Sequence, residues 1–106
     1  MMDATVIEKA VELLLEAAPA GSKVILFGSH ARGDAGPDSD LDFLVIEPRV
    51  ADHRGEMVRL HHVLQPLRAP ADVLVTSAAT FEEWRDTPGT VLYEAAKEGK
   101  VFDAVR

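Results

Sequence analysis

The chain has 106 residues, 47% of them hydrophobic, a size and composition that predict a single domain over residues 1–106 with one buried core. Its 11 Lys and Arg against 18 Asp and Glu give a net charge of −7, which argues against a duplex-DNA binder, because such proteins neutralise phosphates with basic side chains. The chain has no cysteine for disulfides or thiolate sites, no recognisable signal peptide and no apolar run near the ~20 residues that span a bilayer, so a cytoplasmic protein without a membrane segment is expected.

Predicted helices and strands alternate along the chain. A first helix is expected to begin at a capping box, in which Thr5 and Glu8 satisfy free backbone groups reciprocally. The run 23–27 is apolar and rich in β-branched residues, so it predicts a buried strand. The further expected elements are a turn or short helix from Gly28, a strand over 41–46, a helix over 52–65, a strand over 72–76, a short helix from a second capping box at 80–83, a helix over 90–98 and an edge strand over 100–102. This order predicts an α/β fold in which helices pack against a small mixed β-sheet.

The turn after the first predicted strand is a candidate phosphate-binding site. Gly28 allows unusual backbone angles and close approach of a ligand, and Ser29 adds a hydroxyl and an N–H group. A helix starting here would direct free N–H groups toward an anion, and Arg32 could add a charged fork for phosphate oxygens. The alternative is that Gly28 and Ser29 only form a strand-ending turn.

Two well-known phosphate motifs do not fit this turn. Gly28 and Gly33 have the spacing of a P-loop, but Asp34 and Ala35 stand where that motif needs Lys and Ser or Thr. The Gly-x-Gly-x-x-Gly pattern of dinucleotide-binding domains is also missing from the sequence.

Two aspartates at the second predicted strand are candidate metal ligands. Because side chains alternate along a strand, Asp40 and Asp42 are expected to point the same way, with Cα atoms about 6–7 Å apart. Two such carboxylates repel each other unless a cation is bound, and oxygen ligands suit Mg²⁺. The alternative is a solvated acidic strand entry, although an Asp inside an apolar strand is unfavourable and calls for a reason.

Asp72 opens the third predicted strand. If that strand lies beside the second, Asp72 can join the pair as a third carboxylate that binds metal or accepts a proton from an attacking hydroxyl. The alternative is an Asp that only marks the strand entry. The glutamates near the C-terminus, including Glu98, are interpreted as exposed helix positions, and His61 and His62 as part of a solvated helix face.

Together the turn and the acidic strand form one composite motif: Gly28-Ser29-x-Ala31-Arg32-Gly33, six further residues, and then Asp40-x-Asp42. This motif resembles that of the minimal nucleotidyltransferase (MNT) family, part of the DNA polymerase β-like nucleotidyltransferase superfamily. The resemblance implies the nucleotidyltransferase fold and the transfer of AMP from ATP, with two Mg²⁺ ions and release of pyrophosphate. It implies triphosphate binding by Gly28, Ser29 and Arg32, and metal binding and catalysis by Asp40, Asp42 and Asp72.

The resemblance also implies a partner. MNT proteins of this size pair with HEPN-domain toxins, act as antitoxins and can adenylylate a toxin tyrosine. Larger relatives carry an additional acceptor-binding domain that is not recognisable here, so a hetero-oligomer with the acceptor on the partner is expected. Two alternatives remain open: a non-catalytic antitoxin that neutralises its partner by complex formation, and a homo-oligomer that modifies a small molecule.

Overall fold

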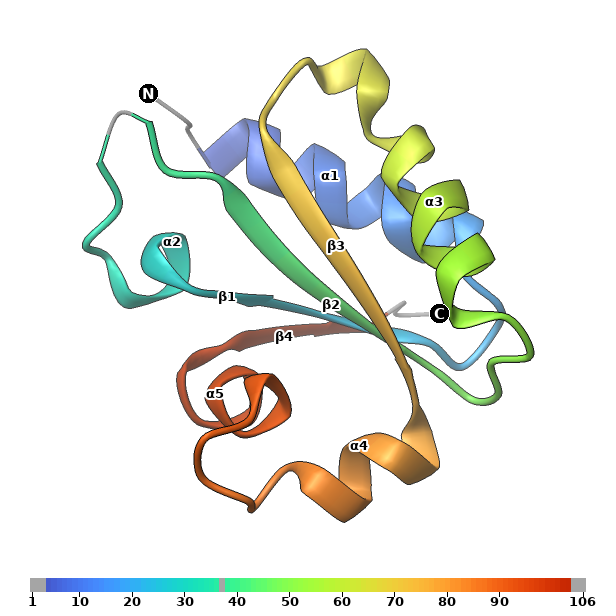
Figure 1. Ribbon diagram of the computed structural model, residues 1–106. Coiled ribbons are helices and arrows are strands. Elements are labelled where there is room, and N and C mark those ends of the chain that lie inside the picture. Colours follow the sequence, from blue (N-terminus) through green and yellow to red (C-terminus); the bar gives the residue numbers. More distant parts are fainter. Residues whose placement is uncertain (1–3, 37, 104–106) are drawn as a thin grey trace.

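A mixed four-stranded sheet forms the centre of the molecule (Figure 1). The computed structural model describes residues 4–36 and 38–103. The strands are β1 (Lys23–Phe27), β2 (Leu41–Glu47), β3 (Ala71–Ser77) and β4 (Lys100–Asp103). In the sheet order β3-β2-β1-β4, β1 runs antiparallel to both of its neighbours, whereas β2 and β3 are parallel. The predicted α/β fold with a small mixed sheet is confirmed, and β3 lies at one edge.

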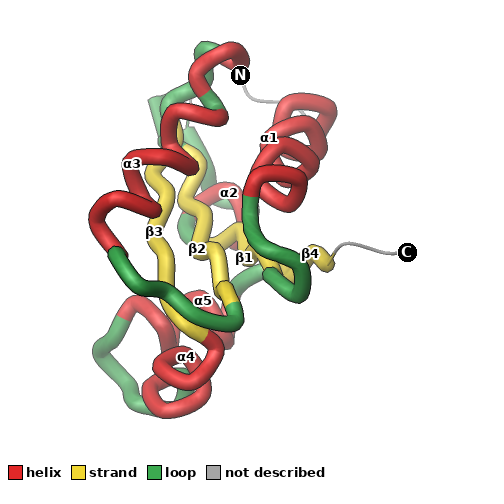
Figure 2. The backbone as a smooth tube through the Cα atoms, turned by 90° about the vertical axis from the view of Figure 1, so that its right-hand side faces the viewer, coloured by secondary structure: helices red, strands yellow, loops and turns green. Residues whose placement is uncertain are grey.

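Helices cover both faces of the sheet. Their bounds are α1 (Ala4–Ala17), α2 (Ser29–Arg32), α3 (His53–Val63), α4 (Ala78–Trp84) and α5 (Val91–Glu98), with a 3₁₀ turn η1 (Gln65–Leu67) after α3. Figures 1 and 2 show α1 and α3 on one side of the sheet and α4 and α5 on the other. The parallel pairing of β2 with β3 needs a crossover, which α3 and η1 provide. In the part of the chain that the structure describes, no helix is both long and apolar enough to cross a membrane.

The alternation of side chains along β2 divides the core into two clusters. Phe43 and Val45 pack in the cluster under α1 and α3, whereas Leu44 and Ile46 pack in the cluster with α4 and α5. Because alternate residues of a strand point to the same side, Asp42 shares the face of Leu44 and Ile46. This alternation places an acidic side chain at one end of an otherwise apolar sheet face.

The two predicted capping boxes are wrong. Thr5 lies inside α1, which already includes Ala4, and Thr80 lies inside α4. The cap of α4 is Ser77, whose hydroxyl oxygen accepts a hydrogen bond from the Thr80 N–H at 3.2 Å and donates one to Thr80 Oγ1 at 3.0 Å. Strand β3 passes into α4 without a loop, so the last residue of the strand acts as the helix cap.

Replacing Ser77 with Ala should therefore lower the free energy of unfolding by about 1 kcal/mol, the usual cost of losing an N-cap. Thr80→Ala should cost less, because Ala is the better helix former inside α4. Urea unfolding of the two variants measures the difference. The reverse order would show that Thr80 is the cap after all.

Glu47, the last residue of β2, is a buried carboxyl group with only 2% of its surface exposed. Burial, and after it the hydrogen bond and negative charge of the facing Glu56, raise its pKa to about 7, although the charge of Arg59 opposes the shift. Hydrogen bonds from Arg59, followed by one from Glu47, lower the pKa of Glu56 to about 2. At neutral pH Glu47 is thus only partly ionised, while Glu56 carries its full charge.

This pair makes the stability depend on pH. The pKa of folded Glu47 lies above its ordinary 4.5, so its contribution to stability is fully present below about pH 4.5 and is lost as pH rises through about 7. Glu56 remains ionised across this window. When the pH is raised from about 5.5 to about 8 in the presence of a chelator, the free energy of unfolding of the wild type should fall. It should fall by about 1–3 kcal/mol more than that of Glu47→Gln, which cannot ionise at this position. Urea titrations at the two pH values measure it, and equal pH dependence in both proteins would contradict the assignment.

Candidate active site

Two carboxylates meet across the parallel strands β2 and β3. Asp42 and Asp72 are paired in register, and both follow the alternation of Leu44 and Leu74, so they point to the same sheet face. Neighbouring strands lie about 4.8 Å apart, which makes the two carboxyl groups neighbours. The two strands are therefore adjacent, which is the condition under which Asp72 could join the acidic pair.

Asp40 lies at the entry to β2. The strand begins at Leu41, whose N–H donates to the carbonyl of Pro70 at 2.9 Å, while Asp40 itself is exposed. Its negative charge nevertheless reaches Asp42. Over residues 4–36 and 38–103, no three His, Asp or Glu side chains converge into a ready-made metal site. The acidic centre is therefore the Asp42–Asp72 pair, with Asp40 at its rim.

The charge on Asp42 is unfavourable in this setting. Burial raises the pKa of Asp42, and the negative charges of Asp72 and then Asp40 raise it further, while His30 and Arg32 act in the opposite direction. Among the described side chains, no ion pair neutralises Asp42 or Asp72. A bound divalent cation would relieve the repulsion, and carboxylate oxygens are the ligands that Mg²⁺ prefers. The donor set therefore fits Mg²⁺, with Asp42 and Asp72 as its principal candidate ligands.

The turn after β1 lies directly against this pair, and only glycine fits it. Gly28 has a φ of 76°, which L side chains rarely adopt, and a Cβ atom added there would run into the Asp42 carboxylate. Gly28 thus lets the backbone that leads into Ser29 approach the acidic centre. Phosphate and cation sites would adjoin here, as the composite motif predicts.

Helix α2 begins immediately after Gly28. None of the described side chains caps its N-terminus, and the N–H groups of Ala31 and Arg32 donate to the carbonyl of Gly28, each at 3.1 Å. The N–H groups available to a ligand beside the Ser29 hydroxyl are therefore those of the first two residues of the helix. The ring of His30 donates from Nε2 to the carbonyl of Ser39 at 3.2 Å. This hydrogen bond holds the segment that leads into Asp40 next to α2, a positioning role that the sequence analysis missed.

Arg32 is held away from the carboxylate pair. Its Nη1 lies 3.1 Å from Glu98 Oε2, at the end of α5, and its Nε lies 3.3 Å from Asp34 Oδ2. The hydrogen bonds that Arg32 donates to Glu98 and then to Asp34 raise the pKa of the guanidinium. The sequence marked Glu98 only as an exposed helix position, because nothing local links it to a residue 66 positions away. Arg32 would have to leave these partners to reach a phosphate.

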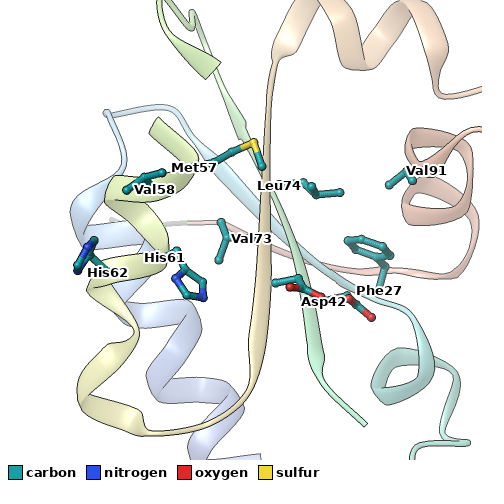
Figure 3. Close-up of a pocket in the computed structure, with 10 residues that line it drawn as sticks. Phe27, Asp42, Met57, Val58, His61, His62, Val73, Leu74 and Val91 are labelled. Carbon is teal, nitrogen blue, oxygen red and sulfur yellow. The ribbon is translucent and has the colours of Figure 1, made fainter. Parts of the chain in front are cut away.

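A cleft of about 540 Å³ opens beside the carboxylates. Figure 3 shows Asp42 next to Phe27 on one side of β3 and His61, from α3, on the other. The cleft is lined by Phe27, Asp42, Met57, Val58, His61, His62, Asp72, Val73, Leu74 and Val91. These apolar walls could not be predicted from the sequence, because their side chains come from helices and strands that only the tertiary fold brings together.

Comparisons with known proteins agree with this geometry. The fold resembles the crystal structure of a candidate nucleotidyltransferase from Sulfolobus solfataricus, with a TM-score of 0.60 and 21% sequence identity over 92% of this chain and 77% of that one. The comparison with curated proteins gave no match. The family model for the nucleotidyltransferase domain matches residues 7–102, which include the glycine turn and all three aspartates. The chain therefore belongs to the nucleotidyltransferase domain family.

Proposed function

We propose that the protein transfers AMP from ATP to a hydroxyl group of a partner protein, with Mg²⁺ as cofactor. The acceptor oxygen attacks the α-phosphorus of ATP and forms a new P–O bond. The bond from the α-phosphorus to the oxygen that bridges to the β-phosphate breaks, and pyrophosphate leaves. Bound Mg²⁺ would polarise the phosphates and balance their charge.

One observation carries this proposal: the glycine turn touches Asp42, which is itself paired with Asp72. Phosphate groups at Ser29 would then adjoin the carboxylates that hold the cation. Asp42 is half-buried and fixed within the sheet, which suits a metal ligand. Asp72 is exposed, lies on the edge strand and lines the cleft, so it can accept the proton of an incoming hydroxyl.

For the acceptor, we propose a tyrosine of a HEPN-type toxin, as the resemblance implies. The apolar walls beside Asp72 support an aromatic acceptor. Val58 and Val91, which are 55% and 43% exposed, are two of the large hydrophobic side chains that the described chain leaves exposed, and both line the cleft. A partner that covers them would bury apolar surface while presenting its hydroxyl to Asp72.

The test is to incubate the protein with ATP, Mg²⁺ and a purified HEPN-type partner, and to measure intact masses of both chains. The proposal predicts that the partner gains the mass of one or more AMP units and that chelation of Mg²⁺ prevents the gain. Tandem mass spectrometry then locates the modified side chain. Inhibition of the toxin without an adduct would instead identify the protein as a non-catalytic binding module.

A further inference from the structure

Two buried side-chain oxygens lack a hydrogen-bond partner in the described part of the chain. They are Ser22 Oγ and Glu47 Oε2, on residues that are 5% and 2% exposed. A buried polar atom without a partner destabilises the folded state, and most buried polar atoms in native proteins are hydrogen-bonded to protein or to ordered water. A ligand that binds these two oxygens would therefore stabilise the folded protein.

The two oxygens belong to one niche. The antiparallel register pairs Lys23 with Ile46, so Ser22 and Glu47 occupy the next pair of opposite positions. Opposite residues of an antiparallel pair point to the same face, here the face covered by α1 and α3. The niche lies at the end of β2 remote from Asp42, so it is separate from the candidate active site.

The groups around the niche are rich in oxygen. Glu56 of α3 faces Glu47, and Arg59 donates to both Glu56 oxygens at 2.8 and 2.7 Å and to the carbonyl of Ala17 at 2.9 Å. Nε and Nη2 of the guanidinium thus bind Glu56 and the C-terminus of α1, which is the negative end of the helix dipole. Glu47 receives no hydrogen bond from it in the described structure.

A cleft of about 440 Å³ leads to this niche. Its lining carries the acidic groups of Glu47, Asp52 and Glu56 and the basic groups of Arg49 and Arg59. Arg59 is held by Glu56, and Asp52 caps α3 by accepting from the Gly55 N–H at 3.0 Å. Among the described residues that line this cleft, Glu47 has the buried side-chain oxygen, Oε2, without a hydrogen-bond partner, and hard divalent cations prefer carboxylate oxygens as ligands.

We propose that Glu47, Ser22 and Glu56 form a second cation site, which takes a hard divalent cation of the Mg²⁺ or Ca²⁺ class. The bound cation satisfies both of these oxygens and links Ser22, the residue before β1, and the end of β2 to α3. It thereby fixes the helix whose residues Met57 and Val58 line the active-site cleft. This site is independent of the proposed AMP transfer.

Mn²⁺ is the probe for the test, since it is a hard divalent cation that electron paramagnetic resonance detects directly. Asp42→Asn/Asp72→Asn serves as the parent protein, so that the active-site carboxylates contribute no binding. We expect one Mn²⁺ per chain in this parent, a loss of affinity of about 10-fold or more on adding Glu47→Gln, and a smaller loss on adding Ser22→Ala. Glu83→Gln, at an exposed glutamate of α4, is the matched control and should bind Mn²⁺ like the parent.

Circular dichroism and thermal midpoints distinguish a loss of the cation site from a loss of the fold. Gln resembles a protonated Glu in shape, so Glu47→Gln should keep the fold, which circular dichroism checks. Mn²⁺ should raise the thermal midpoint of the parent and of Glu83→Gln, but not that of the Glu47→Gln variant. Absence of Mn²⁺ binding by the parent, or equal binding after Glu47→Gln, would overturn the proposal and leave water or a proton as the occupant of the niche.

Discussion

Asp42→Asn is expected to reduce AMP transfer by about 10²–10³-fold while leaving the fold intact. Asn is nearly isosteric with Asp but lacks the negative charge that a divalent cation needs. Burial and the charges of Asp72 and Asp40 already raise the pKa of Asp42, so the ionised carboxylate destabilises the folded state. The variant should therefore have an unchanged or raised thermal midpoint, which separates loss of chemistry from loss of structure.

The matched control for this change is Asp86→Asn, at an exposed aspartate between α4 and α5. It should keep both the transfer rate and the thermal midpoint. Initial rates of AMP transfer at saturating ATP, together with thermal melts of both variants, make the comparison. A fully active Asp42→Asn enzyme would remove Asp42 from the mechanism.

Gly28→Ala should damage both stability and activity. The φ of 76° costs an L residue about 1–2 kcal/mol, and the added methyl group must also displace the Asp42 carboxylate. Displacing this carboxylate moves a proposed metal ligand relative to the phosphate turn. Since a 1 Å misplacement can cost about 10²-fold in rate, we expect a loss of at least that size.

Gly33→Ala separates the effect of backbone strain from the effect of displacing the Asp42 carboxylate. Gly33 has a similar φ of 87°, but a Cβ atom there would meet nothing within 4 Å. This variant should lose about 1–2 kcal/mol of stability through backbone strain and keep most of its transfer activity. Urea unfolding and transfer assays on both variants measure the contrast, and an equal loss of activity in the two would contradict the role assigned to the Gly28–Asp42 contact.

The central strands could be predicted because their signals are local. The run 23–27 coincides with β1, and the runs 41–46 and 72–76 lie within β2 and β3. Apolar and β-branched side chains in short runs between turn residues leave few other structures. The helix starts were predicted less well. Thr80 has the capping-box spacing to Glu83, but α4 already begins after Ser77, whose hydroxyl accepts a hydrogen bond from the Thr80 N–H.

The surroundings of the candidate site could not be predicted from the sequence, because they depend on contacts between distant segments. The Arg32–Glu98 ion pair joins α2 to α5, and Val58 and Val91 reach the same cleft from α3 and α5. Glu47 follows the apolar run of β2, and nothing in the neighbouring sequence predicts that its side chain is buried. Only the packing of α1 and α3 over the strand end shows that its carboxyl group is enclosed.

The proposed AMP transfer requires that Asp42 and Asp72 jointly hold a divalent cation that binds the phosphates of ATP. Isothermal titration calorimetry of ATP with the wild type and with Asp42→Asn/Asp72→Asn, each in Mg²⁺ and in chelator, measures this coupling. Mg²⁺ should tighten ATP binding by about 10-fold or more in the wild type and have little effect in the double variant. ATP affinity that is the same with and without Mg²⁺ in the wild type would contradict it.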